Sequence, residues 1–193
     1  MGHQLPSLRV SLPCKASPEE VYDVLADLQT HLDWGGTRQP KDFRLLTLEA
    51  PRGAAPVGTV FSSTGTFPMS SRRWEDRSTV TVADRPRTFE FETEGRAGER
   101  NPMTARYRHH YEIAPEAAGS RVTYMLNQLA IANPMLRETL PGIRQLVWRV
   151  AMPKLSARGL RNLLAYVEER AARTRATRPS AGVAGHPLPT REA

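Results

Sequence analysis

The chain has 193 residues, of which 39 % are hydrophobic and 24 % are charged, a composition typical of one soluble globular domain. No apolar run reaches the roughly 20 residues that a membrane-spanning helix needs. The first residues also lack the basic stretch and apolar run of a signal peptide. We therefore expect a cytoplasmic protein without a transmembrane segment.

The distribution of the net charge of +7 argues against a specific nucleic-acid site. Between residues 171 and 193, four arginines accompany a single glutamate, and the remaining excess is spread along the chain. A basic tail binds polyanions weakly and without sequence preference. Because Ala, Pro, Gly and Thr are frequent at 173–193, we expect a disordered tail there. It would follow a domain of residues 7–172 and a short extension, residues 1–6.

The sequence offers few groups for metal or redox chemistry. Cys14 is the only cysteine, so an intrachain disulfide and a multi-cysteine zinc site are excluded. Its alternation with Val10 and Leu12 predicts a buried strand residue. His109 and His110 are adjacent, and neighbouring strand residues point to opposite faces, so the two cannot chelate one ion. We expect no metal site and no cofactor.

The first predicted elements are a strand and two short helices. Residues 8–15 alternate apolar and polar side chains, which predicts the strand. Ser17 and Glu20 have the spacing of a capping box, which predicts a helix start. A second helical piece at residues 29–34 should end at the glycine pair 35–36, because glycine readily adopts the left-handed conformation that stops a helix.

Six more segments have the alternation and β-branched content of strands. They cover residues 43–49, 58–67, 74–82, 88–93, 103–113 and 121–131. In the third of them, Trp74, Asp76, Ser78, Val80 and Val82 share one predicted face. Connections of hairpin length between successive strands predict an antiparallel meander.

After the last strand the apolar period changes to that of a helix. The periodic residues are Leu136, Leu140, Ile143, Val147, Val150, Leu160, Leu163, Leu164 and Val167. They predict a long helix from about residue 134 to about Arg173. We expect it to start or kink at Pro141, Gly142 or Pro153.

The segment 136–155 has three interpretations. Its apolar stripe can face the core as part of the long helix. It can also form a mobile lid whose Trp148 touches a ligand. Trp148 and the neighbouring basic residues also suit a helix that makes weak contact with a membrane surface.

The order of the elements is that of a helix-grip fold, and four stretches of sequence agree with it. They are ASPEEVYDVLAD at 16–27, TVTVADRPRTFEFE at 79–92, GSRVTY at 119–124 and LRNLLAYVE at 160–168. Together they resemble the polyketide cyclase/dehydrase group of the START-like (SRPBCC) superfamily. The resemblance implies an α+β fold in which a curved antiparallel sheet wraps around a long C-terminal helix and encloses a hydrophobic pocket.

The superfamily resembled includes lipid and hormone binders, coenzyme Q-binding proteins, chaperone adaptors and aromatase/cyclases, so fold alone does not give the function. Our leading hypothesis is a carrier or sensor that binds a small hydrophobic molecule, a lipid or a polyketide-like metabolite. The first alternative is a polyketide cyclase/dehydratase that uses acid/base chemistry without metal or nucleotide. Aromatase/cyclases are thought to act through a pocket arginine, and the matching position near Val80 is apolar here. The second alternative is a coenzyme Q-type or partner-binding adaptor that uses the surface of residues 136–155.

Aromatic and polar residues on the predicted inward faces make up the expected pocket. The expected ligand-binding residues are Trp74, Ser78, Phe89, Phe91, Tyr107, His109, Tyr111, Tyr124, Leu126, Gln128, Val147 and Trp148. His109 with Asp76 is the candidate acid/base pair, because histidine titrates near neutral pH. The alternative for His109 is a hydrogen bond to a tyrosine in the pocket wall. A slip of one residue would turn Asp76 and Gln128 to solvent instead.

Overall fold

The computed structural model describes residues 6–39, 43–68, 72–98, 103–132 and 146–177. Its strands are β1 (Ser7–Cys14), β2 (Arg44–Glu49), β3 (Val60–Thr66), β4 (Arg73–Asp84), β5 (Thr88–Ala97), β6 (Met103–Glu116) and β7 (Gly119–Ala132). Its helices are α1 (Pro18–Ala26), the short turns η1 (Leu28–Thr30), η2 (Asp33–Thr37) and η4 (Val147–Ala151), and α3 (Met152–Thr177).

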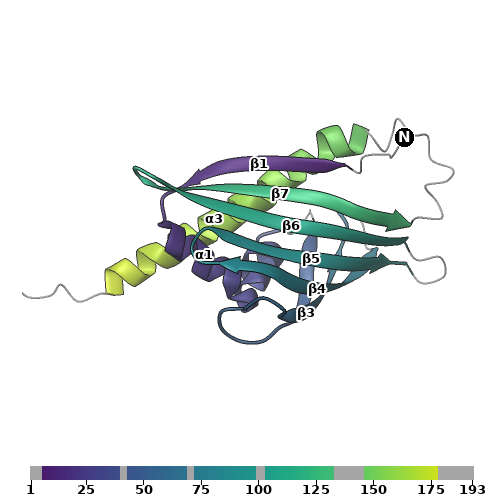
Figure 1. Ribbon diagram of the computed structural model, residues 1–193, viewed down its shortest axis with the longest axis horizontal. Coiled ribbons are helices and arrows are strands. Elements are labelled where there is room, and N and C mark those ends of the chain that lie inside the picture. Colours follow the sequence, from purple (N-terminus) through teal and green to yellow (C-terminus); the bar gives the residue numbers. More distant parts are fainter. Residues whose placement is uncertain (1–5, 40–42, 69–71, 99–102, 133–145, 178–193) are drawn as a thin grey trace, which may run out of the picture.

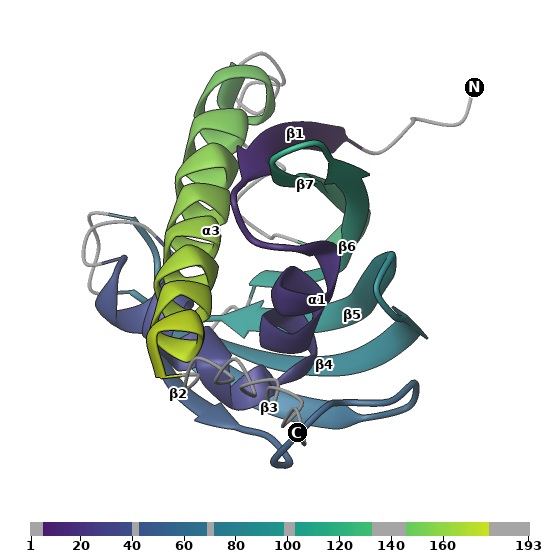
Figure 2. The same cartoon turned by 90° about the vertical axis from the view of Figure 1, so that its left-hand side faces the viewer.

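The strands described form one curved antiparallel sheet. Their order is β1-β7-β6-β5-β4-β3-β2, so β2 to β7 follow one another as a meander and β1 pairs with β7. Helix α3 runs along the concave side of the sheet, and α1 lies between them at one end (Figures 1 and 2). This confirms the α+β helix-grip fold and the antiparallel meander expected from the sequence.

Local signals in the first elements are confirmed. Ser17 Oγ accepts a hydrogen bond from the Glu20 backbone N–H at 3.2 Å, and Glu20 Oε2 accepts one from the Ser17 backbone N–H at 2.8 Å. This reciprocal capping box begins α1, which buries Val21 and Leu25 against the sheet. Cys14 at the end of β1 is buried, as its alternation predicted.

The glycine pair at 35–36 does not end the helical segment, so this prediction was wrong. Both glycines are buried within η2, a π-helical turn that continues to Thr37, and neither has a positive φ. A Cβ on Gly36 would lie 2.9 Å from the backbone oxygen of Leu45. The glycine is therefore needed for the close approach of β2, not for a left-handed conformation.

A bulge in β4 corrects the predicted phase of Val82. The register shifts between Val80 and Val82, after which Ala83 pairs with Phe89 and packs on the core. Val82 instead pairs with Glu90 on the opposite face. An extra residue in one strand reverses the facing of everything beyond it, so only the part of β4 before the bulge keeps its predicted face.

Helix α3 closes the concave side of the sheet. It buries Leu160, Leu163, Leu164 and Val167, all of which belong to the predicted apolar stripe. The helix ends at Thr177, a turn beyond its expected end. Among the described residues, no helix has the length and apolar character needed to cross a membrane.

The predicted irregularity at Pro153 is present at the start of α3. Proline lacks an N–H group and cannot continue the regular bonding pattern. One residue before it, the Met152 N–H bonds to the Val147 carbonyl, five positions back, which closes the π-helical turn η4. The other expected breakpoints, Pro141 and Gly142, lie outside the described residues, as do Leu136, Leu140 and Ile143.

Candidate functional site

A cavity of about 450 Å³ lies between the concave face of the sheet and α3. Side chains from β2 to β7, from η2, from η4 and from the first half of α3 line it. The volume falls within the range of small-molecule sites, and the lining is mainly aromatic and aliphatic, as such sites usually are.

Stacked rings form the wall that β5, β6 and β7 contribute. Phe91 and His109 lie face to face, with ring centroids 4.6 Å apart and an interplanar angle of 11°. Tyr111 and Tyr124 follow at 4.9 Å. These rings come from alternate residues of neighbouring strands, so the pleat places them on one face. The result is a row of contacting aromatic rings on one side of the cavity, in which Tyr111 and Tyr124 are tilted by 36°.

His109 is a neutral member of this wall. Its Nδ1 is 2.8 Å from Tyr124 Oη, the hydrogen bond that one of the two sequence interpretations expected. Burial and, to a smaller extent, the nearby His31 together lower the pKa of His109 to about 4. No hydrogen bond joins His109 to Asp76 in the described part of the chain. The acid/base pair considered from the sequence is therefore not assembled here.

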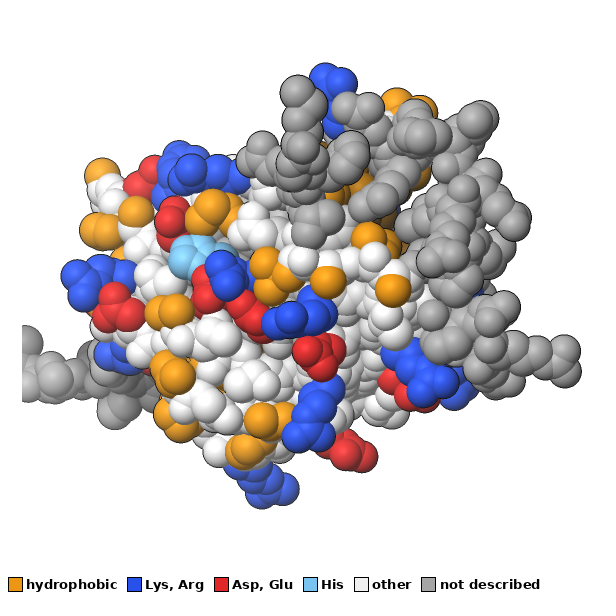
Figure 3. All heavy atoms as spheres, turned by 45° about the vertical axis from the view of Figure 1, so that its right-hand side comes forward, with side chains coloured by type: hydrophobic (Ala, Val, Ile, Leu, Met, Phe, Trp, Pro, Cys, Tyr) orange, Lys and Arg blue, Asp and Glu red, His pale blue; other side chains and the backbone are white. Residues whose placement is uncertain are grey.

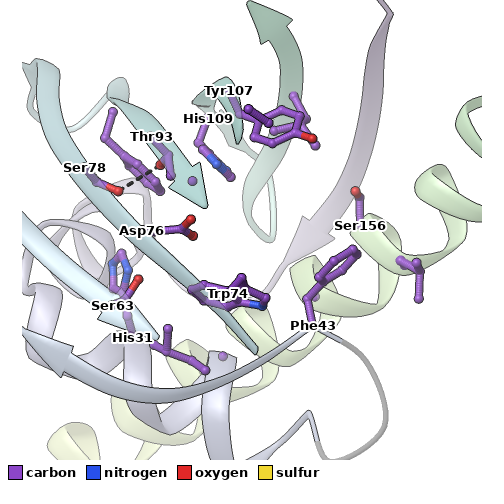
Figure 4. A pocket seen from close by; sticks show the side chains of 18 of the residues that line it. His31, Phe43, Ser63, Trp74, Asp76, Ser78, Thr93, Tyr107, His109 and Ser156 are labelled. Atoms are coloured by element: carbon purple, nitrogen blue, oxygen red, sulfur yellow. Dashed lines mark hydrogen bonds between the residues drawn. The ribbon is translucent and has the colours of Figure 1, made fainter. Parts of the chain in front are cut away.

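Asp76 extends from β4 into the cavity, where Figure 4 shows its carboxylate between Trp74 and His109. Asp76 is half-buried, and among the described residues its carboxylate has no hydrogen-bond or ion-pair partner. Desolvation by burial raises its pKa to about 7. A Cβ on Gly95, which pairs with Asp76 across β4 and β5, would lie 2.5 Å from Asp76 Oδ1. The glycine thus leaves the space that the carboxylate occupies.

Two tryptophans add polar atoms without partners. Among the described residues, the indole N–H groups of Trp34 and Trp74 are buried and make no hydrogen bond. Trp74 lies over Gly65 of β3, where any Cβ would collide with the indole ring. Figure 4 shows Trp74 reaching across the cavity floor toward Phe43. Both indole donors belong to side chains that line the cavity.

Other polar groups in the cavity already have partners. Ser78 Oγ and Thr93 Oγ1 are 2.8 Å apart and share a hydrogen bond between β4 and β5. His31, from the segment between η1 and η2, directs Nε2 at the Leu25 carbonyl oxygen, 2.9 Å away. Burial lowers the pKa of His31 to about 4. Within the described residues, no cluster of His, Cys, Asp or Glu is arranged to hold a metal ion.

Most of the residues expected from the sequence line the cavity. They are Trp74, Asp76, Ser78, Phe91, Tyr107, His109, Tyr111, Tyr124, Leu126, Val147 and Trp148. Phe89 does not line it, because Tyr22 of α1 covers that ring edge-on at 6.0 Å. Gln128 is buried, opposite Tyr107 in the β6–β7 pairing, but it too lies outside the lining. Whether the lining residues bind a ligand stays a prediction.

The sequence did not point to several lining residues. His31, Trp34, Phe43, Leu45, Leu48, Phe61, Ser63, Phe67, Met152, Leu155 and Ser156 all border the cavity. The alternation of Phe61 with Ser63 in β3 was a usable signal. The residues of η2 and β2 had none, because their position depends on how these elements fold over the edge of the sheet.

The turn η4, which precedes α3, has one side on the cavity and one side in solvent. Trp148 and Val147 line the cavity, and the Trp148 ring lies 6.4 Å from that of Tyr107. Leu146, Val147 and Val150 are exposed by 62 %, 44 % and 46 %. Two residues of the predicted apolar stripe, Val147 and Val150, are thus partly in solvent. The described part of residues 136–155 therefore does not face the core with its whole apolar stripe. Its roles as a lid or as a membrane-contacting helix stay predictions.

Comparison with solved structures supports the fold. A protein of Rhizobium leguminosarum is similar, with a TM-score of 0.62 and 12 % identity over 84 % of this chain and 94 % of that one. A protein of Nitrosomonas europaea has a TM-score of 0.59 and 12 % identity over 89 % of this chain and 99 % of that one. A Mycobacterium smegmatis protein has a TM-score of 0.57 and 14 % identity over 86 % of this chain and 93 % of that one. At these identities the likeness concerns the fold alone. A search of curated proteins finds no match.

The sequence itself matches a family model over residues 6–168, which spans the sheet, the cavity and most of α3. The model describes polyketide cyclases or dehydrases and lipid transport proteins. The match agrees with the resemblance found in the four sequence stretches. The chain therefore belongs to the polyketide cyclase/dehydrase and lipid transport family.

Proposed function

We propose that the chain binds a small, largely apolar molecule in the cavity, a lipid or a polyketide-like metabolite, and acts as its carrier or sensor. The observation that carries this proposal is the cavity itself, about 450 Å³ of space lined mainly by aromatic and aliphatic side chains. A concave site of this size with an apolar lining and a few polar groups has the usual make-up of a small-molecule site.

The lining sets the kind of ligand that we propose. Most of the side chains around the cavity are aromatic or aliphatic, and sites of this make-up bind molecules that are apolar over most of their surface. The indole N–H groups of Trp34 and Trp74 are buried without a partner among the described residues, but they have no surface open to the cavity and so do not select the ligand.

Native mass spectrometry of the purified protein, followed by organic extraction, tests this proposal. We expect a bound lipophilic compound at a ratio near one to one. Ala105→Trp, which adds a large side chain inside the cavity, should abolish the bound mass. The matched variant Ala130→Trp changes an exposed residue that pairs with Arg106 across β6 and β7, and should retain it. A protein that stays empty when offered a range of lipids and aromatic compounds contradicts the proposal.

Asp76 supports a second candidate, a cyclase or dehydratase. A carboxyl group with a pKa of about 7 can both accept and donate a proton near neutral pH, as acid/base catalysis requires. In a dehydration, Asp76 would take the proton next to a ligand carbonyl and return it to the departing hydroxyl, which leaves as water. His109 is not needed, because it is neutral and bonded to Tyr124.

The dehydratase candidate is tested with a synthetic aromatic β-hydroxyketone, whose conversion to the conjugated enone is followed by absorbance. We expect Asp76→Asn to abolish turnover and to leave binding of the compound intact. Turnover that survives this substitution removes Asp76 from the mechanism. A wild-type protein that binds the compound without converting it favours the carrier.

A further inference from the structure

The cavity contains an acidic group for which the described chain provides no counter-charge. His31 and His109, the histidines that line the cavity, are held neutral by burial. The lining tyrosines Tyr111 and Tyr124 have raised pKa values and stay protonated. Arg96 lines the cavity too, but its side chain is exposed, and burial alone accounts for the raised pKa of Asp76.

The position of this carboxylate is built into the sheet. Asp76 lies on the inward face of β4, and the absence of a side chain at Gly95 makes room for it. A half-buried acid without a partner loses part of its hydration and destabilises the fold, and nothing in the packing of β4 or β5 requires one. A neutral residue of similar size would fill the same space at lower cost. The acid therefore indicates something that binds to it.

The surroundings of Asp76 favour a cation over a neutral hydrogen-bond donor. In Figure 4 the carboxylate lies between Trp74 and His109, and His109 stacks on Phe91. Aromatic faces attract cations, and tryptophan does so most strongly. A protonated amine gains from both the carboxylate and the rings, whereas a hydroxyl gains mainly from the carboxylate.

We propose that the cavity selects an aromatic ligand that carries a protonated amine, with the ammonium group against Asp76 and the aromatic ring against the wall of Phe91 and Tyr124. This inference rests on the proposed function, because it names the chemical class of the ligand that the cavity binds. It narrows the ligands of the proposed function to those with a cationic nitrogen, which fatty acids and neutral polyketides lack.

Three probes of one shape test the inference: 1-naphthylmethylamine, 1-naphthalenemethanol and 1-methylnaphthalene. Their affinities are measured by calorimetry at pH 8, where Asp76 is ionised and the amine is protonated. For the wild type we expect the amine to bind about tenfold more tightly than the alcohol. The reason is that a hydrogen bond between two charged groups stays stronger than a neutral one after the cost of desolvation is subtracted. Asp76→Asn should abolish this preference. Glu75→Gln, which removes an exposed acid from the same strand, should retain it.

Binding of 1-methylnaphthalene, which has no polar group, distinguishes failure of the amine inference from failure of the proposed function. If the wild type binds it but prefers the alcohol or shows no preference, the amine inference is wrong and the proposed function stands. An amine preference that persists in Asp76→Asn also overturns the inference. If none of the three probes binds to the wild type, the proposed function fails and the inference fails with it. If the Asp76→Asn variant no longer binds 1-methylnaphthalene, its cavity is damaged and the variant is set aside. The ratio of the wild-type affinities for the amine and the alcohol then decides whether the amine inference holds.

Discussion

The two faces of β5 and β6 carry the same kinds of polar groups in opposite states. On the outer face His110 Nδ1 lies 2.7 Å from Glu90 Oε2, and Arg108 donates to Glu92 at 2.7 Å. Basic and acidic side chains lie side by side over this surface (Figure 3). On the inner face the adjacent His109 is bonded to a tyrosine and held neutral.

The contrast extends to the acids. The outer carboxylates of Glu90 and Glu92 are paired with Arg108, whereas Asp76 on the inner face of β4 has no partner among the described residues. Burial makes a charge costly unless it is paired. The charges of the outer face thus balance one another within the sheet, whereas the acid on the inner face has no counter-charge among the described residues.

The largest difference between the faces should appear in stability. Phe89→Ala removes a ring that is 0 % exposed and should lower the free energy of unfolding by about 3–5 kcal/mol. Glu92→Ala removes half-exposed ion pairs with Arg106 and Arg108 and should cost about 1 kcal/mol or less. Urea unfolding of both variants measures the two effects. Equal losses of unfolding free energy would contradict the expectation that the ion pairs on the outer face contribute little to stability.

The second prediction concerns the unpaired acid. The pKa of Asp76 is raised from 3.8 to about 7 in the fold, so the unfolded chain releases this proton at lower pH than the folded one. Stability is therefore lost as pH rises from about 4 to about 7, where each pH unit is worth about 1.4 kcal/mol. Asp76→Asn should raise the unfolding free energy at pH 7.5, by up to about 4 kcal/mol, and leave it unchanged near pH 3.5.

Urea unfolding of Asp76→Asn at these two pH values, with Glu75→Gln as control, measures the effect. The exposed Glu75 lies next to Asp76 and should show no comparable gain. A destabilised Asp76→Asn protein at pH 7.5 would mean that the carboxylate has a stabilising partner after all.

The third prediction concerns the buried histidine. The pKa of His109 falls from 6.5 to about 4 on folding, so the unfolded chain binds this proton at higher pH than the folded one. Stability is therefore lost as pH falls from about 6.5 to about 4, by about 3 kcal/mol for one such group. His31 behaves alike. His109→Gln should remove one of the two contributions.

Unfolding free energies between pH 7 and pH 4 give this result as a shallower slope in the variant. His110→Gln, on the outer face, is the matched control for a lost histidine. An unchanged slope in His109→Gln would contradict the burial of a neutral imidazole in the aromatic wall.

Signals carried by neighbouring residues were readable from the sequence. The capping box of Ser17 and Glu20 involves one helical turn, and the inward series of Tyr107, His109 and Tyr111 follows from the pleat of a single strand. Both depend on local geometry that the chain imposes on itself. The fold and most of the cavity wall could therefore be predicted.

What the sequence did not reveal depends on contacts between distant segments. Gly36 is required by the Leu45 backbone, and Phe89 leaves the cavity because Tyr22 of α1 covers it, although Phe91 on the same face stays. The bulge that turns Val82 outward has no marker such as glycine or proline in the strand. Such features are decided when the elements pack, and one residue type in the sequence allows several outcomes.

The smallest predicted effect concerns the ligand affinity and compares the two sides of the turn η4. Trp148 and Val150 lie in the same turn, η4, but Trp148 lines the cavity and Val150 is exposed. Trp148→Ala should weaken binding of 1-methylnaphthalene by about tenfold, through loss of the contact area that a large aromatic ring provides. Val150→Gln should leave the affinity within about twofold. If Val150→Gln instead weakens binding as much as Trp148→Ala, the exposed side of η4 contacts the ligand in the bound state, which favours the lid interpretation of this segment over a fixed wall.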